Sequence, residues 1–182
     1  DGTVREVTYI EFYQTVEALG ASLTEMGLGS SHIAIVSENR YDWIVAYLTV
    51  LQSAGVFVPI DRQLTTKEKL HLLTDSESEA VFFSKQYLTW FVENKASMPN
   101  IKAFICFDID KDTDGIISYK RLIAEGAKLD KTAYDSLKSN ENELKMLVYT
   151  SGTTGIAKGV MLSEHNLVSG VYYGLQVSRI YD

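Results

Sequence analysis

The sequence predicts an α/β domain with a largely parallel sheet and helices on both faces. Short apolar runs rich in β-branched and aromatic residues alternate along the chain with segments whose apolar residues recur at helical spacing. Strands that alternate with helices form parallel sheets whose faces the helices cover. The pattern does not determine the order of the strands in the sheet.

Helices are predicted where a start signal precedes the helical spacing. Thr8 and Glu11 form a capping box that opens the first helix, which Gly27 or Gly29 ends. Thr65 and Glu68 form a second capping box. Further helices are predicted over residues 42–54, 87–93, 118–127 and 132–137.

Six apolar runs are predicted to be strands, and they cover residues 33–36, 56–60, 80–83, 102–107, 144–149 and 159–162. The polar, acid-rich stretch 139–143 is expected to be a loop or linker before the fifth of these strands. No internal repeat and no low-complexity segment is found.

The composition excludes several classes of function. The 182 residues include 17 Lys and Arg against 24 Asp and Glu, for a formal net charge of −7, so nucleic-acid binding is not expected. The single cysteine, Cys106, lies in an apolar run and is expected to be a small buried side chain. It cannot form an internal disulfide, and no neighbouring ligand completes a metal pair. A cytoplasmic location is therefore expected, and the chain shows no secretory signal.

The uncharged stretch from residue 43 to residue 60 approaches the length of a transmembrane helix. Gly55 and Pro59 interrupt it, and the residues between them favour a strand. We therefore expect a helix that ends at Gly55, then a buried strand, and no transmembrane segment. Peripheral membrane association of the full enzyme is left open.

Residues 110–118 match the opening of an EF-hand calcium loop, with acids at loop positions one, three and five and Gly115 at position six. The match fails at position twelve, where Arg121 stands instead of a bidentate Glu. The preceding segment is also predicted to be a strand rather than a helix. An acidic surface turn with Asp114-Gly115 as its tight bend is the preferred interpretation, so no metal site is expected.

The segment that indicates chemistry is a loop rich in hydroxyls and glycines between two apolar strands. Its glycines let backbone amides approach an anion, its hydroxyls can donate to phosphate oxygens, and its lysine supplies positive charge. A polyphosphate suits such a loop. The candidate phosphate-binding residues are Thr150, Ser151, Gly152, Thr153, Thr154, Gly155 and Lys158.

An ordinary Walker A loop fits this segment poorly. When Gly152 and Lys158 are aligned with the first Gly and the Lys of that pattern, Ala157 occupies the position of the second Gly. Gly159 then occupies the position of the Ser or Thr that binds Mg²⁺. The residues after Lys158 also favour a strand, whereas a Walker loop opens a helix. A flexible hairpin with no ligand is the other alternative.

Residues 149–162 closely resemble the signature of the AMP-forming adenylate synthetases, which include acyl-CoA synthetases, luciferases and peptide-synthetase adenylation domains. The resemblance extends upstream through residues 37–40 with Trp43, residues 55–61 and residues 73–76. Two departures stand out. Ala157 replaces a usual proline, and Glu164-His165 stands where the family commonly has a His followed by a variable residue. His165 is therefore assigned no catalytic role and is expected to be a solvated residue in the first turn of a helix.

This resemblance implies a fold and a reaction. The chain would be the N-terminal part of an AMP-binding domain, covering residues 1–182 and incomplete. The family activates a carboxylic acid with ATP and Mg²⁺ to an acyl-adenylate, then transfers the acyl group to a thiol such as that of CoA. The partners implied are small molecules: ATP, a carboxylic acid and CoA. Residues 37–43 and 163–167 most resemble fatty-acid CoA ligases of the long-chain type, although an amino or aryl acid is the alternative substrate.

The resemblance also implies what this chain lacks. In the family, the adenine site, the acid pocket and a C-terminal catalytic lysine lie downstream of the phosphate loop, so we expect no catalytic residue within the chain and no turnover by the chain alone. The loop itself is expected to be mobile without ligand, because it has few apolar side chains to bury. A non-catalytic nucleotide-binding module is the alternative from another class.

Overall fold

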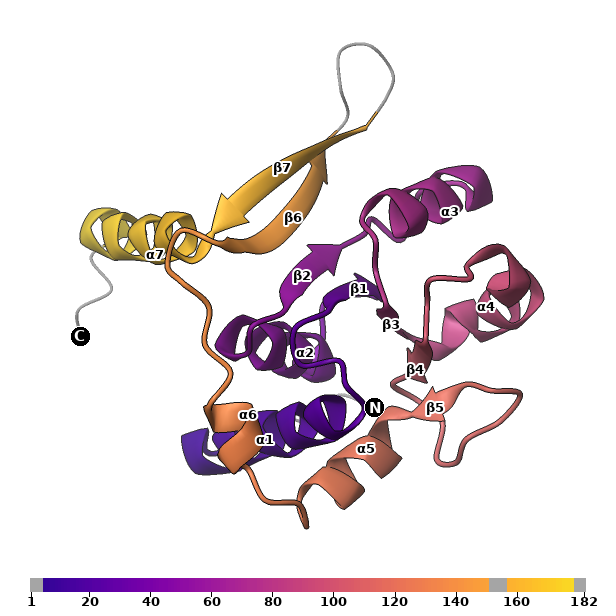
Figure 1. Cartoon of the computed structure of the whole chain (residues 1–182), viewed down its shortest axis with the longest axis horizontal. Helices are drawn as coiled ribbons and strands as arrows, with labels where there is room; N and C mark the ends of the chain where they lie inside the picture. Colours follow the sequence, from indigo (N-terminus) through magenta and orange to yellow (C-terminus); the bar gives the residue numbers. More distant parts are fainter. Residues whose placement is uncertain (1–4, 151–156, 179–182) are drawn as a thin grey trace.

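The computed structural model describes residues 5–150 and 157–178 and contains a seven-stranded sheet with helices on both faces (Figure 1). The strand order is β5-β4-β3-β1-β2-β6-β7. All neighbouring strands are parallel except the last pair, β6 and β7. The strands are β1 (His32–Val36), β2 (Val56–Pro59), β3 (Ala80–Phe83), β4 (Ala103–Cys106), β5 (Ile117–Ser118), β6 (Leu144–Thr150) and β7 (Lys158–Ser163).

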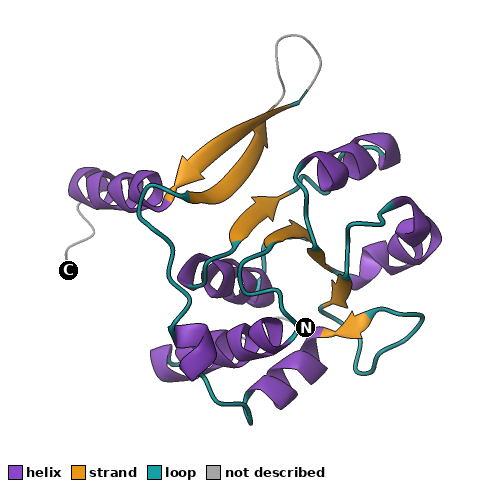
Figure 2. Ribbon diagram, viewed as in Figure 1, coloured by secondary structure: helices purple, strands orange, loops and turns teal. Residues whose placement is uncertain are grey.

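The helices lie between the strands along the chain, as the alternating pattern predicts (Figure 2). They are α1 (Tyr9–Glu25), α2 (Tyr41–Gln52), α3 (Thr66–Asp75), α4 (Leu88–Asn94), α5 (Tyr119–Gly126), α6 (Thr132–Asp135) and α7 (Glu164–Ser178). Two short 3₁₀ turns, η1 (Lys85–Tyr87) and η2 (Lys95–Ser97), flank α4.

Two hydrophobic cores lie on opposite faces of the sheet because successive side chains of a strand point to opposite sides. In β1, Ile33 and Ile35 join the core that also contains residues of α1, α2 and α5. Ala34 and Val36 join the other core, with α3 and α4. The central strands are thus buried on both faces, which explains their continuous apolar sequences.

Local signals set the helix starts where they were expected. The Glu11 amide donates to the Thr8 hydroxyl at 3.2 Å while the Thr8 amide donates to the Glu11 carboxylate at 2.8 Å, completing a capping box. Thr65 and Glu68 form the same reciprocal pair at the start of α3. Gly27 follows α1 with a φ of 75°, the left-handed conformation that ends a helix at little steric cost.

Several boundaries differ from the prediction. Helix α2 ends at Gln52, before Gly55, because the backbone turns at Ser53, whose amide donates to the Val50 carbonyl. The predicted helix 87–93 is a 3₁₀ turn followed by α4, and the predicted helix 132–137 is one turn long. Strand β5 was not predicted, because two residues carry no periodicity.

The calcium-loop pattern forms a surface turn, as preferred above. Asp114 and Gly115 both have positive φ, at 50° and 73°, and Thr113 and Ile116 exchange two backbone hydrogen bonds across them. Two of the three acids that would bind calcium, Asp110 and Asp112, instead pair with Lys120 and Arg121. Within residues 5–150 and 157–178, no group of three His, Cys, Asp or Glu side chains could hold a metal ion.

The uncharged stretch 43–60 is divided between α2 and β2. In the described parts of the chain, no helix has the length and apolar character needed to cross a membrane. Cys106 is fully buried in β4, and burial raises the pKa of its thiol.

Candidate functional site

The predicted phosphate loop joins the two strands of a hairpin that projects from one edge of the sheet (Figure 1). Strands β6 and β7 pair antiparallel from Leu144 with Ser163 to Thr150 with Lys158. Because β7 begins at Lys158 and continues as a strand to Ser163, the helix that a Walker A loop requires is not formed there. The two strands that were expected beside the loop are confirmed.

Two of the seven predicted site residues lie in the described part of the hairpin. Thr150 and Lys158 are directly opposite each other in the strand register, and the Thr150 hydroxyl is 3.5 Å from the Lys158 carbonyl oxygen. Both are exposed, and no described carboxylate lies within ion-pairing distance of the Lys158 ammonium. Ser151, Gly152, Thr153, Thr154 and Gly155, and the expected mobility of the loop, fall outside the described residues.

The hairpin joins the parallel sheet through β6, which lies beside β2. Strand β6 aligns with β2 at a single residue pair, Met146 with Phe57, and residues 147–150 extend past it. The side chains of Leu147 and Tyr149 pack on the core that α3 covers, whereas Met146 packs on the opposite core. Gly159 lies opposite Tyr149, and a Cβ atom there would approach the Leu147 side chain at 2.8 Å.

A side-chain hydrogen bond connects the end of β6 to α3. The Tyr149 hydroxyl donates to the Asp75 carboxylate at 2.6 Å. Burial of the side chain, then the hydrogen bond to Asp75 and the Asp75 charge, raise the pKa of Tyr149, so the hydroxyl remains a donor. Sequence reasoning missed Asp75 as a partner, because 74 positions separate it from Tyr149 and no local spacing links them.

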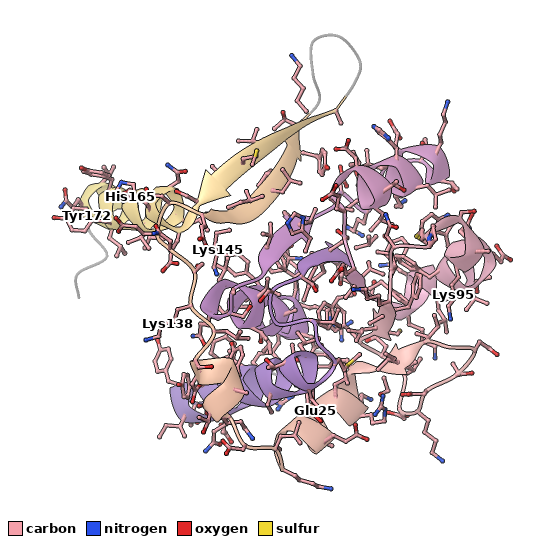
Figure 3. The ribbon with its side chains drawn as sticks, in the orientation of Figure 1. Glu25, Lys95, Lys138, Lys145, His165 and Tyr172 are labelled. Carbon is pink, nitrogen blue, oxygen red and sulfur yellow. The ribbon has the colours of Figure 1, made fainter. Side chains whose placement is uncertain are left out.

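Lys145 anchors the base of β6 to the body of the molecule. Figure 3 shows it where the hairpin meets the helical layer, and its side chain is 1% exposed. Its ammonium donates to the Ser53 carbonyl at the end of α2 and to the Ser139 hydroxyl at 2.9 Å. Burial lowers the pKa of Lys145, and the nearby charges of Glu164 and Glu143 oppose part of that shift.

A polar cavity of about 510 Å³ lies beside Tyr149, at the carboxyl ends of β1, β2 and β6. The loop after β1 forms one wall with Glu38 and Asn39, and Asp61 and Arg62 after β2 form another. In open α/β sheets, ligands bind at the carboxyl ends of the strands, so the hairpin and this cavity occupy the edge where such a site is expected.

The loop after β1 is held by charges rather than by apolar packing. Arg40 pairs with Asp108 at 2.7 Å, with Asp42 at 2.8 Å and with Glu38 at 3.4 Å. Glu38 also accepts hydrogen bonds from Ser84 and Gln86, which follow β3. Burial opposes the charge of Arg40, but the hydrogen bond and charge of Asp108, together with Asp42, raise its pKa. The loops after β1, β3 and β4 are therefore fixed relative to one another.

His165 lies in the first turn of α7 and is exposed (Figure 3), as expected. Its backbone amide donates to the Glu141 carbonyl at 2.8 Å, and no described side chain bonds to its ring. Ser163 and Asn166 form the start of that helix, since each amide donates to the other side chain.

The sequence model described as AMP-binding enzyme matches residues 1–180. A long-chain-fatty-acid–CoA ligase of Thermus thermophilus is 27% identical over 168 residues, which is 92% of this chain and 30% of that protein. A 4-hydroxybutyrate–CoA ligase of Metallosphaera sedula is 30% identical over 167 residues, or 85% of this chain and 29% of that protein. The chain thus spans less than a third of the length of these relatives.

The fold has counterparts among solved structures. The adenylation and carrier didomain of carboxylic acid reductase from Segniliparus rugosus, solved in complex with AMP, superposes with a TM-score of 0.80. The match covers 91% of this chain and 26% of that chain at 19% sequence identity. This likeness shows that the sheet and helices described here are arranged as in the corresponding part of an adenylation domain.

Proposed function

The chain belongs to the AMP-binding enzyme family, and from that premise we propose that it carries the ATP-phosphate site of an enzyme that activates a carboxylic acid. In the first step a carboxylate oxygen bonds to the α-phosphorus of ATP, and the bond from that phosphorus to the bridging oxygen breaks to release pyrophosphate. In the second step the thiol of CoA attacks the acyl carbon, and AMP leaves. The chain covers less than a third of the length of the relatives named above, so we propose that other parts of the whole enzyme complete the site.

The observation that carries the proposal is the placement of Thr150 opposite Lys158 across the hairpin. This arrangement puts a hydroxyl donor and a cation at the two ends of the segment that contains Ser151, Gly152, Thr153, Thr154 and Gly155. We assign these seven residues to the β- and γ-phosphates of ATP. Lys158 supplies the charge that stabilises the leaving pyrophosphate, and the hydroxyls and glycine amides supply neutral donors.

Mg²⁺ has a limited place in this proposal. The described residues offer no cluster of three His, Cys, Asp or Glu side chains, so that part of the chain does not form an all-protein metal site. Magnesium is commonly held by one or two carboxylates and the substrate's own phosphates. We therefore include it only as the ion that accompanies ATP, and no step is assigned to it.

For the substrate we propose a fatty acid, of the long-chain type indicated by residues 37–43 and 163–167. The two relatives named above differ in the acid their names specify, a long-chain fatty acid and 4-hydroxybutyrate. Pyrophosphate release by the complete enzyme, measured with fatty, hydroxy, aryl and amino acids in turn, would identify the class. Turnover of aryl or amino acids in preference to fatty acids would overturn this choice.

The test of the proposed function is Lys158→Ala in the complete enzyme. Adenylation should slow by a factor of about 100 to 1,000, because a cation beside a developing negative charge lowers that barrier selectively. Thioester formation from supplied acyl-adenylate should change little, since pyrophosphate is already gone. Pyrophosphate release and acyl-adenylate consumption time the two steps separately.

Lys128→Ala is a matched control, because Lys128 is also an exposed lysine but lies between α5 and α6, away from the hairpin. It should leave both steps unchanged. Equal loss of both steps in a folded Lys158→Ala protein would refute the phosphate role of Lys158. Binding of ATP by the 182-residue chain alone in the micromolar range would instead favour a non-catalytic nucleotide-binding module.

A further inference from the structure

The described residues of the phosphate-binding hairpin are attached to the body of the molecule at the base of β6 and, nearer the proposed phosphate contacts, through Tyr149. Lys145 and the Met146–Phe57 pair hold the base of β6. Tyr149, three residues beyond that pair, is joined to Asp75 through its hydroxyl. Apolar side chains of the hairpin also pack on the core that α3 covers, but the Tyr149–Asp75 bond is the contact that fixes the direction of the end of β6 relative to α3.

We propose that Tyr149 and Asp75 are positioning residues that hold the phosphate-binding end of the hairpin against α3. This inference rests on the proposed function and adds to it two residues that do not touch ATP themselves. The bond fixes Tyr149, whose neighbour in the chain is Thr150, and Thr150 is paired across the hairpin with Lys158. The position of α3 therefore determines where both phosphate contacts lie.

The surroundings of the bond make it directional. The Tyr149 ring packs on the α3 side of the sheet and lines the carboxyl-edge cavity, so its hydroxyl cannot turn toward the opposite core. Asp75 is the last residue of α3, and the neighbouring Leu72 and Leu73 are buried in the core. One end of the bond is thus fixed by a helix in the core and the other by the strand that leads to the loop.

Loss of this bond should affect the affinity for ATP more than the maximal rate. A hairpin that is not held would adopt several orientations, and only the fraction that matches the phosphates would bind ATP. The apparent dissociation constant for ATP therefore equals the intrinsic constant divided by that fraction. Saturating ATP shifts the hairpin fully to the matching orientation, so the maximal rate is unchanged. Since a hydrogen bond to a charged group at a partly exposed site contributes modestly, we expect the KM for ATP to rise about three- to tenfold.

The experiment uses the complete enzyme and a set of variants at this bond. Tyr149→Phe removes only the hydroxyl, and Asp75→Ala removes the acceptor; each should raise the KM for ATP while kcat changes less than about twofold. Asp75→Asn keeps an oxygen that can accept the bond and should remain close to the parent enzyme. The double variant Tyr149→Phe/Asp75→Ala should be no worse than either single variant, because both remove the same interaction.

Tyr134→Phe is the matched control. The Tyr134 hydroxyl donates to the Thr49 carbonyl at 2.9 Å. This bond joins α6 to α2 and involves no residue of the hairpin. Its loss should lower the unfolding midpoint without changing the KM for ATP. The unfolding midpoints of all variants show whether a rise in the KM for ATP comes from a misplaced hairpin or from a destabilised fold.

An unchanged KM for ATP in Tyr149→Phe would overturn the inference, as would multiplying effects in the double variant. An equal rise in the KM for the acid would overturn it too, because it would indicate general damage. If Lys158→Ala slows adenylation selectively but Tyr149→Phe has no effect, only the positioning role fails. If Lys158→Ala shows no selective effect, the proposed function fails.

Discussion

At the scale of single residues, buried and half-buried polar groups in this protein connect segments that are distant in sequence. Lys145 connects β6 to the end of α2, 92 positions earlier, and Tyr149 connects β6 to the end of α3. Each of these side chains has a partner, as the cost of an unpaired buried polar group requires. A search for motifs does not find such pairs, because the two partners are far apart in the chain.

Lys145 gives a prediction for alkaline pH. Burial lowers its pKa in the folded state below the value of about 10.4 in the unfolded chain, so the unfolded state binds more protons between those two pKa values. Stability should therefore rise with pH across that window. In Lys145→Met this contribution is absent, so the difference in free energy of unfolding between the parent and the variant should shift in the parent's favour as pH increases.

Chemical denaturation of both proteins from pH 8 to pH 10.5 measures this difference, and other alkaline groups cancel because both proteins contain them. A difference that stays constant, or that moves in the variant's favour, would show that Lys145 is not perturbed in the folded state.

At the scale of elements, the helix contacts depend on glycines where backbones approach closely. A Cβ atom at Gly126 of α5 would lie 1.8 Å from the Ala18 carbonyl oxygen of α1. At Gly20 of α1, a Cβ would lie 2.4 Å from the Tyr134 ring of α6. Helix α1 thus packs closely against both α5 and α6. At its contact with α5, the buried Ser22 hydroxyl donates to the Leu122 carbonyl.

The same substitution in two helices should have opposite effects. Gly126→Ala forces α5 away from α1 and should destabilise the chain by about 3 kcal/mol, because the clash is with backbone that cannot move aside. Gly170→Ala in α7 meets no atom within 4 Å and should stabilise by about 0.5–1 kcal/mol through helix propensity. Urea unfolding measures both; a harmless Gly126→Ala would mean that α1 and α5 are not closely packed.

At the scale of the whole molecule, charges hold the loops and apolar side chains hold the sheet. Arg40 and its carboxylate partners connect the ends of β1 and β4, while the two cores lie on either face. Helix α7 lies at the far side of the hairpin, and Val168, Val171 and Tyr172 on it are exposed. The molecule is therefore most firmly packed around β1, β3 and β4 and least around β7 and α7.

Acid should destabilise the whole molecule. Hydrogen bonds and cationic neighbours lower the folded-state pKa of seven carboxyl groups: Glu11, Glu38, Glu68, Glu79, Asp110, Asp112 and Asp130. A lowered carboxyl pKa contributes stability above the unfolded value of about 3.9–4.3, and this contribution is lost as pH falls through the folded value. The free energy of unfolding should thus be nearly constant from pH 7 to pH 5 and fall below about pH 4.

Denaturant unfolding at each pH measures this, with 1 M salt as a comparison that weakens the exposed ion pairs. Stability that increased on acidification below pH 4 would contradict the assigned direction of these pKa shifts.

The sequence alone determined most of the helices and strands, and it placed the loop that we propose to bind phosphate between two of those strands. Those features depend on local spacing: the capping boxes at Thr8 and Thr65, the apolar strands, and the glycines and hydroxyls beside Lys158. Only the tertiary structure decided the strand order, the single-pair attachment of β6 to β2, and the Tyr149–Asp75 and Lys145–Ser53 bonds. These depend on which distant segments meet when both sheet faces are buried, and no short-range pattern encodes that choice because many chain paths bury the same apolar residues.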